Sequence, residues 1–184
     1  MPWSKSQISR LGVEKAILEK FFKDQLEWFE PSGNTKIELK LQSNSDTEYK
    51  LRVYLPTDFP SSCPNMVVVF PKQLTTKNGQ PLPLLDERFH TLGKVDDFTK
   101  LCHYSPELWT EENTLYQVFM KGRLWIEAYE GHLTTGNTMD HYLKHMNQST
   151  QVGNSSNSSE ATSNAGTQNT VAPNEATRWQ CKIS

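Results

Sequence analysis

Apolar residues near the start of the chain recur at intervals of three and four positions. They are Ile8, Leu11, Ile17, Leu18, Phe21 and Phe22. This spacing places an apolar stripe on one face of a helix. The stretch "EPSGN", which starts at Glu30, combines proline and glycine and is expected to stop this helix.

Two stretches then alternate apolar and polar side chains. They are "TKIELKLQ" and "EYKLRVYLP", and the turn-rich "SNSD" separates them. The alternation predicts an antiparallel hairpin with one face exposed to solvent. The run "NMVVVFP" is continuously apolar and lies between prolines, which predicts a third strand that is covered on both faces.

The pattern weakens between Lys72 and Lys100, where turn residues dominate, and we expect loops with room for one short strand. The stretch "TEENTLYQVFMKGRLWIEAYEGHL" predicts a helix that opens at Thr110 with two glutamates in its first turn, and Gly122 weakens its middle. A shorter helix is expected around Met139 to Met146. The mainly buried stripe of the long helix is expected to hold Leu115, Val118, Phe119, Leu124 and Tyr129.

The order of elements predicts an α+β domain in which helices cover one sheet. This domain is expected to span residues 1–146. From Asn147 to Ser184 the chain is rich in Ser, Asn and Thr and nearly free of large apolar side chains. Such a segment cannot bury enough surface to offset its ordering entropy, so residues 147–184 are expected to form a disordered tail.

Composition narrows the function classes. The chain has 184 residues, 35% of them hydrophobic, and a formal net charge of -2. The near-neutral charge disfavours nucleic acid as a partner, and no apolar run approaches the ~20 residues of a membrane span. The three cysteines have no framework or metal-like spacing, and the start "MPWSKSQISR" contains no apolar export segment. We therefore expect a cytoplasmic protein.

Several landmarks follow a recognisable order. The stretch "YLPTDFPSSCPNMVVVFP" contains a strand, a proline, an aromatic residue before proline, a further proline and the next strand. A histidine lies downstream of this stretch, and a cysteine follows twelve residues after the histidine. This order resembles the ubiquitin-conjugating enzyme superfamily over about residues 7–146. The landmarks are Pro56, Phe59, Pro60, Pro64, His90, Cys102, Pro106 and Trp109.

The resemblance implies an N-terminal helix, an antiparallel sheet, an irregular active-site crossing and C-terminal helices. The sequence also departs from the family. His90 is followed by Thr91 and Leu92, so the family's oxyanion-supporting asparagine is missing, and Cys63 replaces one of the paired prolines. The stretch "LCHYSPELWTEENTLYQVFMKGRLWIEAYEGHLTTG" is similar to bacterial members of the fold, which accompany ubiquitin-like or antiphage signalling operons.

The function implied by the resemblance is a transferase in which Cys102 carries a thioester. Cys102 would accept the C-terminal acyl group of a protein modifier, such as a cyclic-nucleotide synthase in antiphage signalling, and pass it to an amine of an acceptor protein. His103 and His90 would tune or position the site, and Trp109 and Pro106 would shape the loop. An irregular segment is expected to leave Cys102 accessible, and backbone N–H groups, His103 or His90 would support the oxyanion. No cofactor and no metal are expected.

Two other functions stay open at this point. The first is a protein-binding module of the same fold, in which Cys102 is a small core residue and His90 braces its loop by hydrogen bonds. The second is a cysteine hydrolase that pairs Cys102 with His103 or His132. No Asp or Asn can be assigned to orient the histidine, which disfavours the hydrolase.

The remaining candidate features have simpler explanations. His141 and His145 would share a helix face and could bind a metal, but a third ligand is not evident. Cys63 is interpreted as structural. The ending "CKIS", which contains Cys181, nominally fits a prenylation site but lacks a polybasic companion. Aromatic residues at helical spacing are expected to be core residues rather than a ligand cage, namely Phe119, Trp125 and Tyr129.

Overall fold

A computed structural model describes residues 2–143 of the chain. A single antiparallel sheet forms its centre, with the strand order β1-β2-β3-β4-β7-β6-β5. The helices and strands are α1 (Lys5–Phe22), β1 (Leu26–Phe29), β2 (Lys36–Gln42), β3 (Glu48–Tyr54), β4 (Asn65–Phe70), β5 (Leu85–Asp86), β6 (Thr91–Val95), β7 (Phe98–Leu101) and α2 (Leu115–Thr135). Four short 3₁₀ helices complete the set, namely η1 (Lys23–Gln25), η2 (Glu87–Phe89), η3 (Pro106–Leu108) and η4 (Met139–His141).

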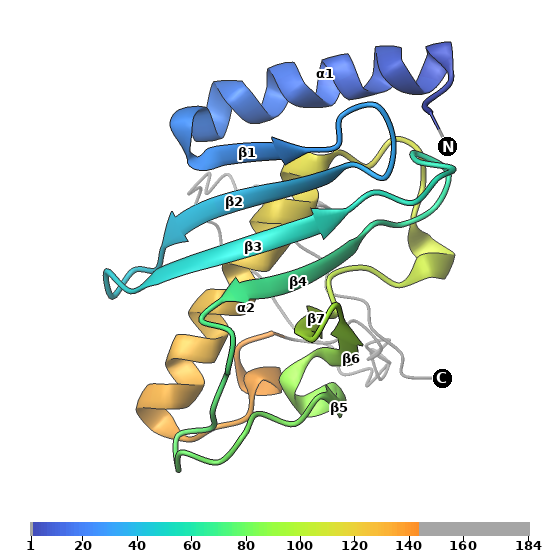
Figure 1. The fold of residues 1–184 in the computed structure, drawn as a ribbon. Helices are drawn as coiled ribbons and strands as arrows, with labels where there is room; N and C mark the ends of the chain where they lie inside the picture. The colour runs from blue at the N-terminus through green and yellow to red at the C-terminus, as the bar shows by residue number, and fades with distance from the viewer. Residues whose placement is uncertain (1, 144–184) are drawn as a thin grey trace, which may run out of the picture.

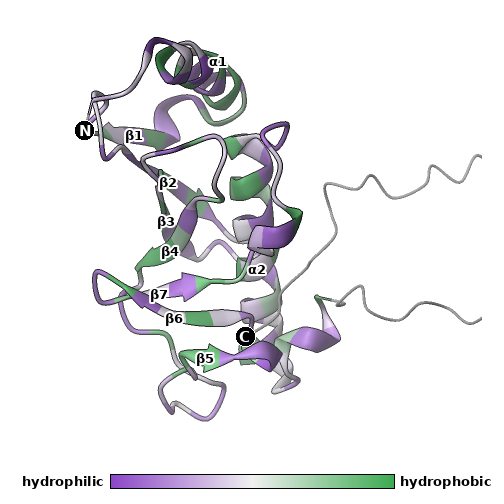
Figure 2. Ribbon diagram, turned by 90° about the vertical axis from the view of Figure 1, so that its right-hand side faces the viewer, coloured by the Kyte–Doolittle hydropathy of each residue, from purple (hydrophilic) through white to green (hydrophobic). Residues whose placement is uncertain are grey.

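The layers confirm the α+β class. Helix α2 runs behind the sheet along one face, and α1 lies beside β1 at the sheet's edge (Figure 1). Turned by 90°, the sheet has α2 on one side only, and the opposite face carries no helix (Figure 2). No helix among residues 2–143 is both long enough and apolar enough to cross a membrane. The predicted tail, residues 147–184, lies outside the described residues.

Helix α1 is present as predicted, but its buried face differs from the predicted stripe. The residues buried on it are Leu11, Glu14 and Leu18, whereas Ile8 and Phe21 are 58% and 53% exposed. The prediction that Ile8 and Phe21 face the core is therefore wrong. Phe21 packs instead against the ring of Tyr116 on α2, with a centroid distance of 4.4 Å. Helix α1 lies at an edge of the sheet rather than over it, so only a narrow stripe is enclosed.

The predicted hairpin is confirmed as β2 and β3. Ile37 pairs with Val53 and Leu39 with Leu51, and all four side chains are buried against α2. Strand β4 is also confirmed, with Met66, Val67 and Val68 buried, although Phe70 at its end is 51% exposed. Helix α1 ends at Phe22, and the unpredicted strand β1 follows it before "EPSGN". The prediction that this stretch stops the helix is therefore wrong.

The expectation of loops between Lys72 and Lys100 is wrong, because three strands form there. Strands β6 and β7 form a tight hairpin in which Val95 pairs with Phe98. The two residues of its turn, Asp96 and Asp97, have φ angles of 48° and 64°. Aspartate tolerates this left-handed region, yet "VDDF" lacks the glycine that usually marks such a turn.

Helix α2 begins four residues later than predicted, at N-cap Thr114 instead of Thr110. Its N-cap is Thr114, whose hydroxyl accepts from the backbone N–H of Gln117 at 3.3 Å, and the Gln117 side chain accepts from the Thr114 N–H. Thr110 caps no helix and instead closes a turn with Asn113. The predicted helix from Met139 to Met146 is one 3₁₀ turn over Met139–His141 within the described residues.

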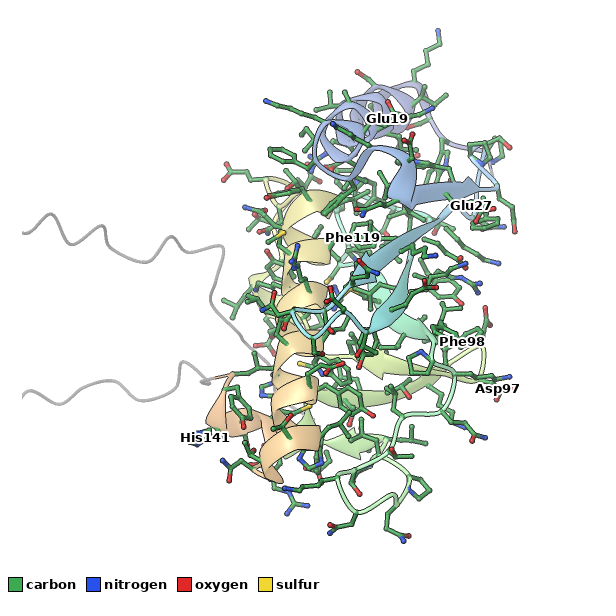
Figure 3. All side chains as sticks on the ribbon, turned by 90° about the vertical axis from the view of Figure 1, so that its left-hand side faces the viewer. Glu19, Glu27, Asp97, Phe98, Phe119 and His141 are labelled. Atoms are coloured by element: carbon green, nitrogen blue, oxygen red, sulfur yellow. The ribbon has the colours of Figure 1, made fainter. Side chains whose placement is uncertain are left out.

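The core lies between α2 and the sheet. Phe119, Trp125 and Tyr129 are buried core residues, as predicted, whereas Leu124 is 36% exposed. Phe119 points from α2 toward the sheet (Figure 3). Gly122 lies where α2 passes so close that an added Cβ would be 2.5 Å from Cδ1 of Leu51. The glycine that weakens the helix pattern is therefore what allows the helix to approach the sheet.

Candidate functional site

Cys102 directly follows strand β7 and continues its hydrogen bonding. Its backbone N–H donates to the carbonyl of His90 at 2.9 Å, next to the paired residues Thr91 and Leu101. This bond holds the residue at the end of the sheet, and its side chain is 1% exposed. The expectation that an irregular segment leaves Cys102 accessible is therefore wrong.

The two described cysteines differ in chemical state. Cys102 is disulfide-bonded, whereas Cys63 is a free thiol. A disulfide differs from the reduced state that a cytoplasmic setting favours.

His90 contacts three other segments of the chain, namely the end of β7, helix α2 and η4. Its carbonyl also accepts from the indole N–H of Trp125 on α2 at 3.2 Å, and its Nε2 lies 3.0 Å from Oδ1 of Asp140 in η4. The residue is fully buried and has a φ angle of 52°, which is uncommon outside glycine. These contacts brace the segment around Cys102, as the simpler interpretation of His90 predicts.

His103 faces Cys63 rather than the sulfur of its neighbour in sequence. Its Nε2 lies 3.9 Å from Sγ of Cys63, and its Nδ1 lies 3.4 Å from the carbonyl oxygen of Leu101. Burial lowers the pKa of His103 to about 4, so the imidazole is neutral near pH 7. A neutral imidazole can accept a proton but cannot stabilise a thiolate by charge.

A buried lysine belongs to the same cluster. Lys121 of α2 places its Nζ 3.5 Å from the ring centroid of Tyr104, and burial lowers the pKa of this lysine to about 8. Burial also raises the pKa of Cys63 to about 12, against the opposing effect of the positive charges of Lys100 and Lys121. At neutral pH, Cys63 is therefore a neutral thiol and a poor nucleophile.

The loop after Cys102 is fixed by an aromatic and a backbone contact. The indole N–H of Trp109 donates to the carbonyl of Pro60 at 2.7 Å, and the Trp109 ring meets the Tyr104 ring edge-on at 5.3 Å. Pro106 is the first residue of η3. Trp109 and Pro106 therefore shape this loop, as the sequence predicts.

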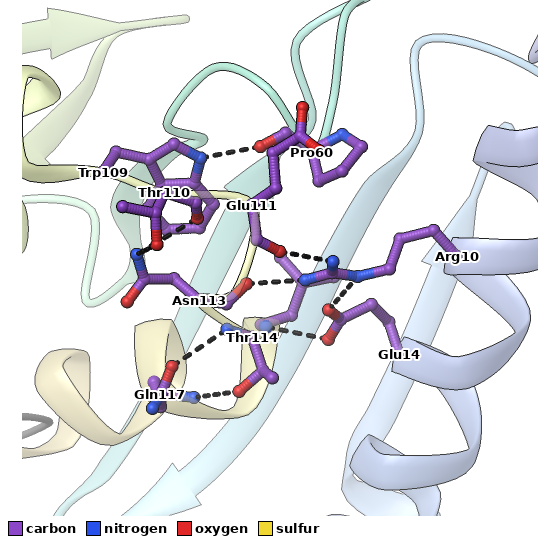
Figure 4. A network of polar contacts seen from close by, with 10 residues as sticks. Arg10, Glu14, Pro60, Trp109, Thr110, Glu111, Asn113, Thr114 and Gln117 are labelled. Atoms are coloured by element: carbon purple, nitrogen blue, oxygen red, sulfur yellow. Dashed lines mark hydrogen bonds and ion pairs between the residues drawn. The ribbon is translucent and has the colours of Figure 1, made fainter.

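A polar network connects the same loop to α1. Arg10 donates to the carbonyls of Glu111 and Asn113 and also pairs with Oε1 of Glu14 at 2.7 Å. The second oxygen of Glu14 accepts from the N–H of Leu115, the first residue of α2, at 2.8 Å (Figure 4). A fully buried carboxylate thus serves both its arginine and a helix N-terminus.

The other histidine candidates are engaged elsewhere. Both ring nitrogens of His132 contact the backbone, because Nε2 accepts from the N–H of Lys77 at 3.2 Å and Nδ1 lies 2.7 Å from the carbonyl oxygen of Asn137. This arrangement leaves no nitrogen of His132 to act as a base for Cys102. His145 lies outside the described residues, and residues 2–143 contain no group of three or more metal-ligating side chains.

Sequence reasoning missed three members of the site. Cys63 meets His103 because β4 and β7 pair, a long-range contact that the sequence does not encode locally. Asp140 of η4 approaches His90 through another contact between segments that are far apart in the sequence. Lys121 could have been found from the sequence, since it interrupts the apolar helix face between Val118 and Trp125.

Comparisons of the chain with protein-family models, curated proteins and solved structures gave no match.

Proposed function

We propose that the protein is a ubiquitin-conjugating-like acyl carrier and that Cys102 is its thioester-forming residue. The observation that carries this proposal is the covalent state of the two described sulfurs. Cys102 is bonded to another sulfur while Cys63 remains a free thiol with a raised pKa. Of the two, the Cys102 sulfur is therefore the one in a covalent bond, and its 1% exposure in this state means that the proposed reaction requires it to be uncovered.

The surroundings of Cys102 support an active-site crossing of that fold. The residue lies between the last strand of the sheet and a loop that Trp109 and Arg10 hold in place. His90 fixes its backbone from the other side. A rigid support of this kind is what a positioned nucleophile needs.

The proposed reaction begins with a cellular thiol reductant that releases Cys102 by thiol–disulfide exchange. The Cys102 thiolate then attacks the activated C-terminal carbonyl of a protein modifier, an S–C bond forms, and the leaving group departs with its bonding electrons. An amine of the acceptor protein attacks the thioester next. A C–N bond forms and the C–S bond breaks. The proton lost by the amine is taken up by the departing sulfur, which regenerates Cys102 as a free thiol.

The missing family asparagine requires another oxyanion donor. Thr91 follows His90, but its hydroxyl donates to the carbonyl of Pro83 at 2.8 Å. The N–H of Cys102 is also occupied, by His90. We propose that modifier binding uncovers Cys102 and frees one donor for the oxyanion. The candidates are a backbone N–H beside Cys102 and the imidazole of His103 or His90.

A second function is favoured by one specific observation. The side chain of Cys102 is 1% exposed, as expected for a residue that only packs in the core of a protein-binding module. In that case no acyl group is ever carried, and Cys102 matters only for stability.

The test uses the full chain produced in its source organism and purified under denaturing, non-reducing conditions. Cys102→Ser is expected to accumulate a protein adduct that resists thiols and is cleaved by mild alkali, because an oxygen ester replaces the thioester. Cys63→Ser is the matched control and should retain the thiol-sensitive adduct of the wild type. Absence of any acyl adduct in all three proteins, with partners still co-purifying in a parallel native purification, would favour the binding module.

A further inference from the structure

A cavity of about 480 Å³ opens between the segment that follows β4 and the β6–β7 hairpin. The residues around Cys102 do not line it, so this cavity is separate from the proposed acyl site. Its lining residues are Lys72, Gln73, Leu74, Thr75, Gly79, Pro81, Leu82, Leu84, Lys94, Asp97 and Thr99. Its volume falls in the range of ~300–1,000 Å³ that is typical of small-molecule sites.

The first wall is a loop that hydrogen bonds fix in place. The N–H of Leu82 donates to the carbonyl of Leu74 at 2.9 Å and closes the loop. The hydroxyl of Tyr129 on α2 accepts from the N–H of Thr75 at 3.0 Å and donates to its carbonyl at 2.9 Å. The wall is therefore tied to the core helix, and the cavity does not depend on a ligand to form.

The second wall is the β6–β7 hairpin, in which Lys94 pairs with Thr99. Asp97 and Phe98 mark the tip of this hairpin, on the side of the sheet away from α2 (Figure 3). Because the turn has only two residues, the backbone at Lys94 is fixed in the hairpin.

The polar groups that line the cavity favour an anion. Lys72 and Lys94 both line it, and Asp97 is the one carboxylate among its lining residues. Among the described residues, no carboxylate oxygen lies within 4.0 Å of either lysine Nζ. The hydroxyl-bearing residues Thr75 and Thr99 add hydrogen-bonding capacity next to this positive charge.

The same cavity also offers apolar surface. Leu74 and Leu82 are 5% and 3% exposed and are fixed in the core, whereas Leu84 is 38% exposed. A leucine exposed beside a cavity gains by contact with an apolar ligand. A free inorganic anion would use the lysines but leave Leu84 uncovered.

We propose that this cavity binds an organic anion, a carboxylate or a phosphate ester on a short apolar chain. Lys72 and Lys94 hold the acidic group, and the apolar chain lies against the exposed side chain of Leu84. Two separated ammonium groups suit either acid, so the structure assigns the shared chemistry of a small amphipathic anion.

The test titrates the ¹⁵N-labelled full chain with hexanoate, hexyl phosphate and the uncharged 1-hexanol, and follows the amide resonances by NMR. Both anions are expected to shift the amides of the lining residues saturably and to bind at least five-fold more tightly than 1-hexanol. The anion that binds more tightly identifies the preferred acidic group. Equal affinity of all three compounds, or shifts located outside the cavity, would overturn the proposal.

Charge variants make the test specific. The double variant Lys72→Gln with Lys94→Gln should lose the preference for the anions and retain the affinity for 1-hexanol. The matched control is Lys5→Gln with Lys15→Gln, two exposed lysines on α1, which should bind like the wild type. A double variant that still prefers the anions would contradict the assignment of the two lysines.

Discussion

Cys63, His103 and Lys121 bring a thiol, an imidazole and an ammonium group together under the loop that follows Cys102. Burial is the first cause of the pKa shift of each of them, and it favours the neutral form in every case. The cluster is therefore organised for packing and support, while the covalent chemistry that we propose belongs to Cys102.

The buried imidazole makes the folded protein sensitive to acid. The pKa of His103 is about 4 in the folded chain, below the unperturbed 6.5. As the pH falls from 6.5 to 4, the unfolded chain takes up a proton that the folded chain excludes, so the free energy of unfolding decreases across this window. His103→Gln should remove a decrease of up to about 3 kcal/mol.

The measurement is urea unfolding of both proteins at several pH values between 7 and 4. His141→Gln is the control, because His141 is exposed in η4. If the wild type and His103→Gln lose stability in parallel as the pH falls, the imidazole is not held neutral.

At the scale of elements, the sequence predicted what periodicity can encode. Strands β2 and β3 follow from alternation, β4 from its continuous apolar run, and the two long helices from helical spacing. Strands β5 to β7 could not be predicted, because each is short and is held by long-range pairing rather than by its own pattern. The start of α2 was misplaced because both Thr110 and Thr114 precede polar residues three positions on, and only Thr114 caps the helix.

The N-cap of α2 provides a direct test of that distinction. Thr114→Ala removes the acceptor for the Gln117 N–H and should lower the free energy of unfolding by about 1 kcal/mol. Thr110→Ala should cost less than half as much, since its contacts lie in an exposed turn. Equal losses in thermal or urea unfolding would show that the cap is misassigned.

Gly122 tests the packing of α2 on the sheet. An added methyl group would lie 2.5 Å from Cδ1 of Leu51 and 2.7 Å from Sδ of Met66, both in fully buried side chains. Gly122→Ala should therefore destabilise the protein by about 1–3 kcal/mol despite the better helix propensity of alanine. Gly12→Ala on α1 meets no atom within 4 Å and should stabilise it by about 0.5–1 kcal/mol. Stabilisation by both substitutions would contradict the close approach.

In the whole molecule, polar contacts connect the two helices to the loop after Cys102. The sequence predicted the α+β architecture and two residues of the loop, Trp109 and Pro106. It could not predict that Glu14 of α1 accepts from the N-terminus of α2, because one hundred and one residues separate Glu14 from Leu115. It left the burial of Cys102 open, because the binding module makes this residue part of the core and the transferase makes it accessible.

The Glu14 network is expected to couple α1 to this loop. Glu14→Ala leaves Arg10 without its carboxylate and Leu115 without its acceptor, so it should cost about 3 kcal/mol. Glu14→Gln retains an acceptor and should cost less. Hydrogen exchange should accelerate at residues 109–115 in Glu14→Ala. Unchanged exchange there would mean that the network does not hold the loop.

Acyl transfer through Cys102 requires a covalent bond between its side chain and another protein. The most direct measurement is tandem mass spectrometry of Cys102→Ser purified from the source organism, with the ester linkage mapped to a residue. We expect the C-terminal residue of another protein esterified to the serine at position 102. Acylation found at Cys63, or a serine that stays unmodified while partners co-purify, would contradict acyl transfer through Cys102.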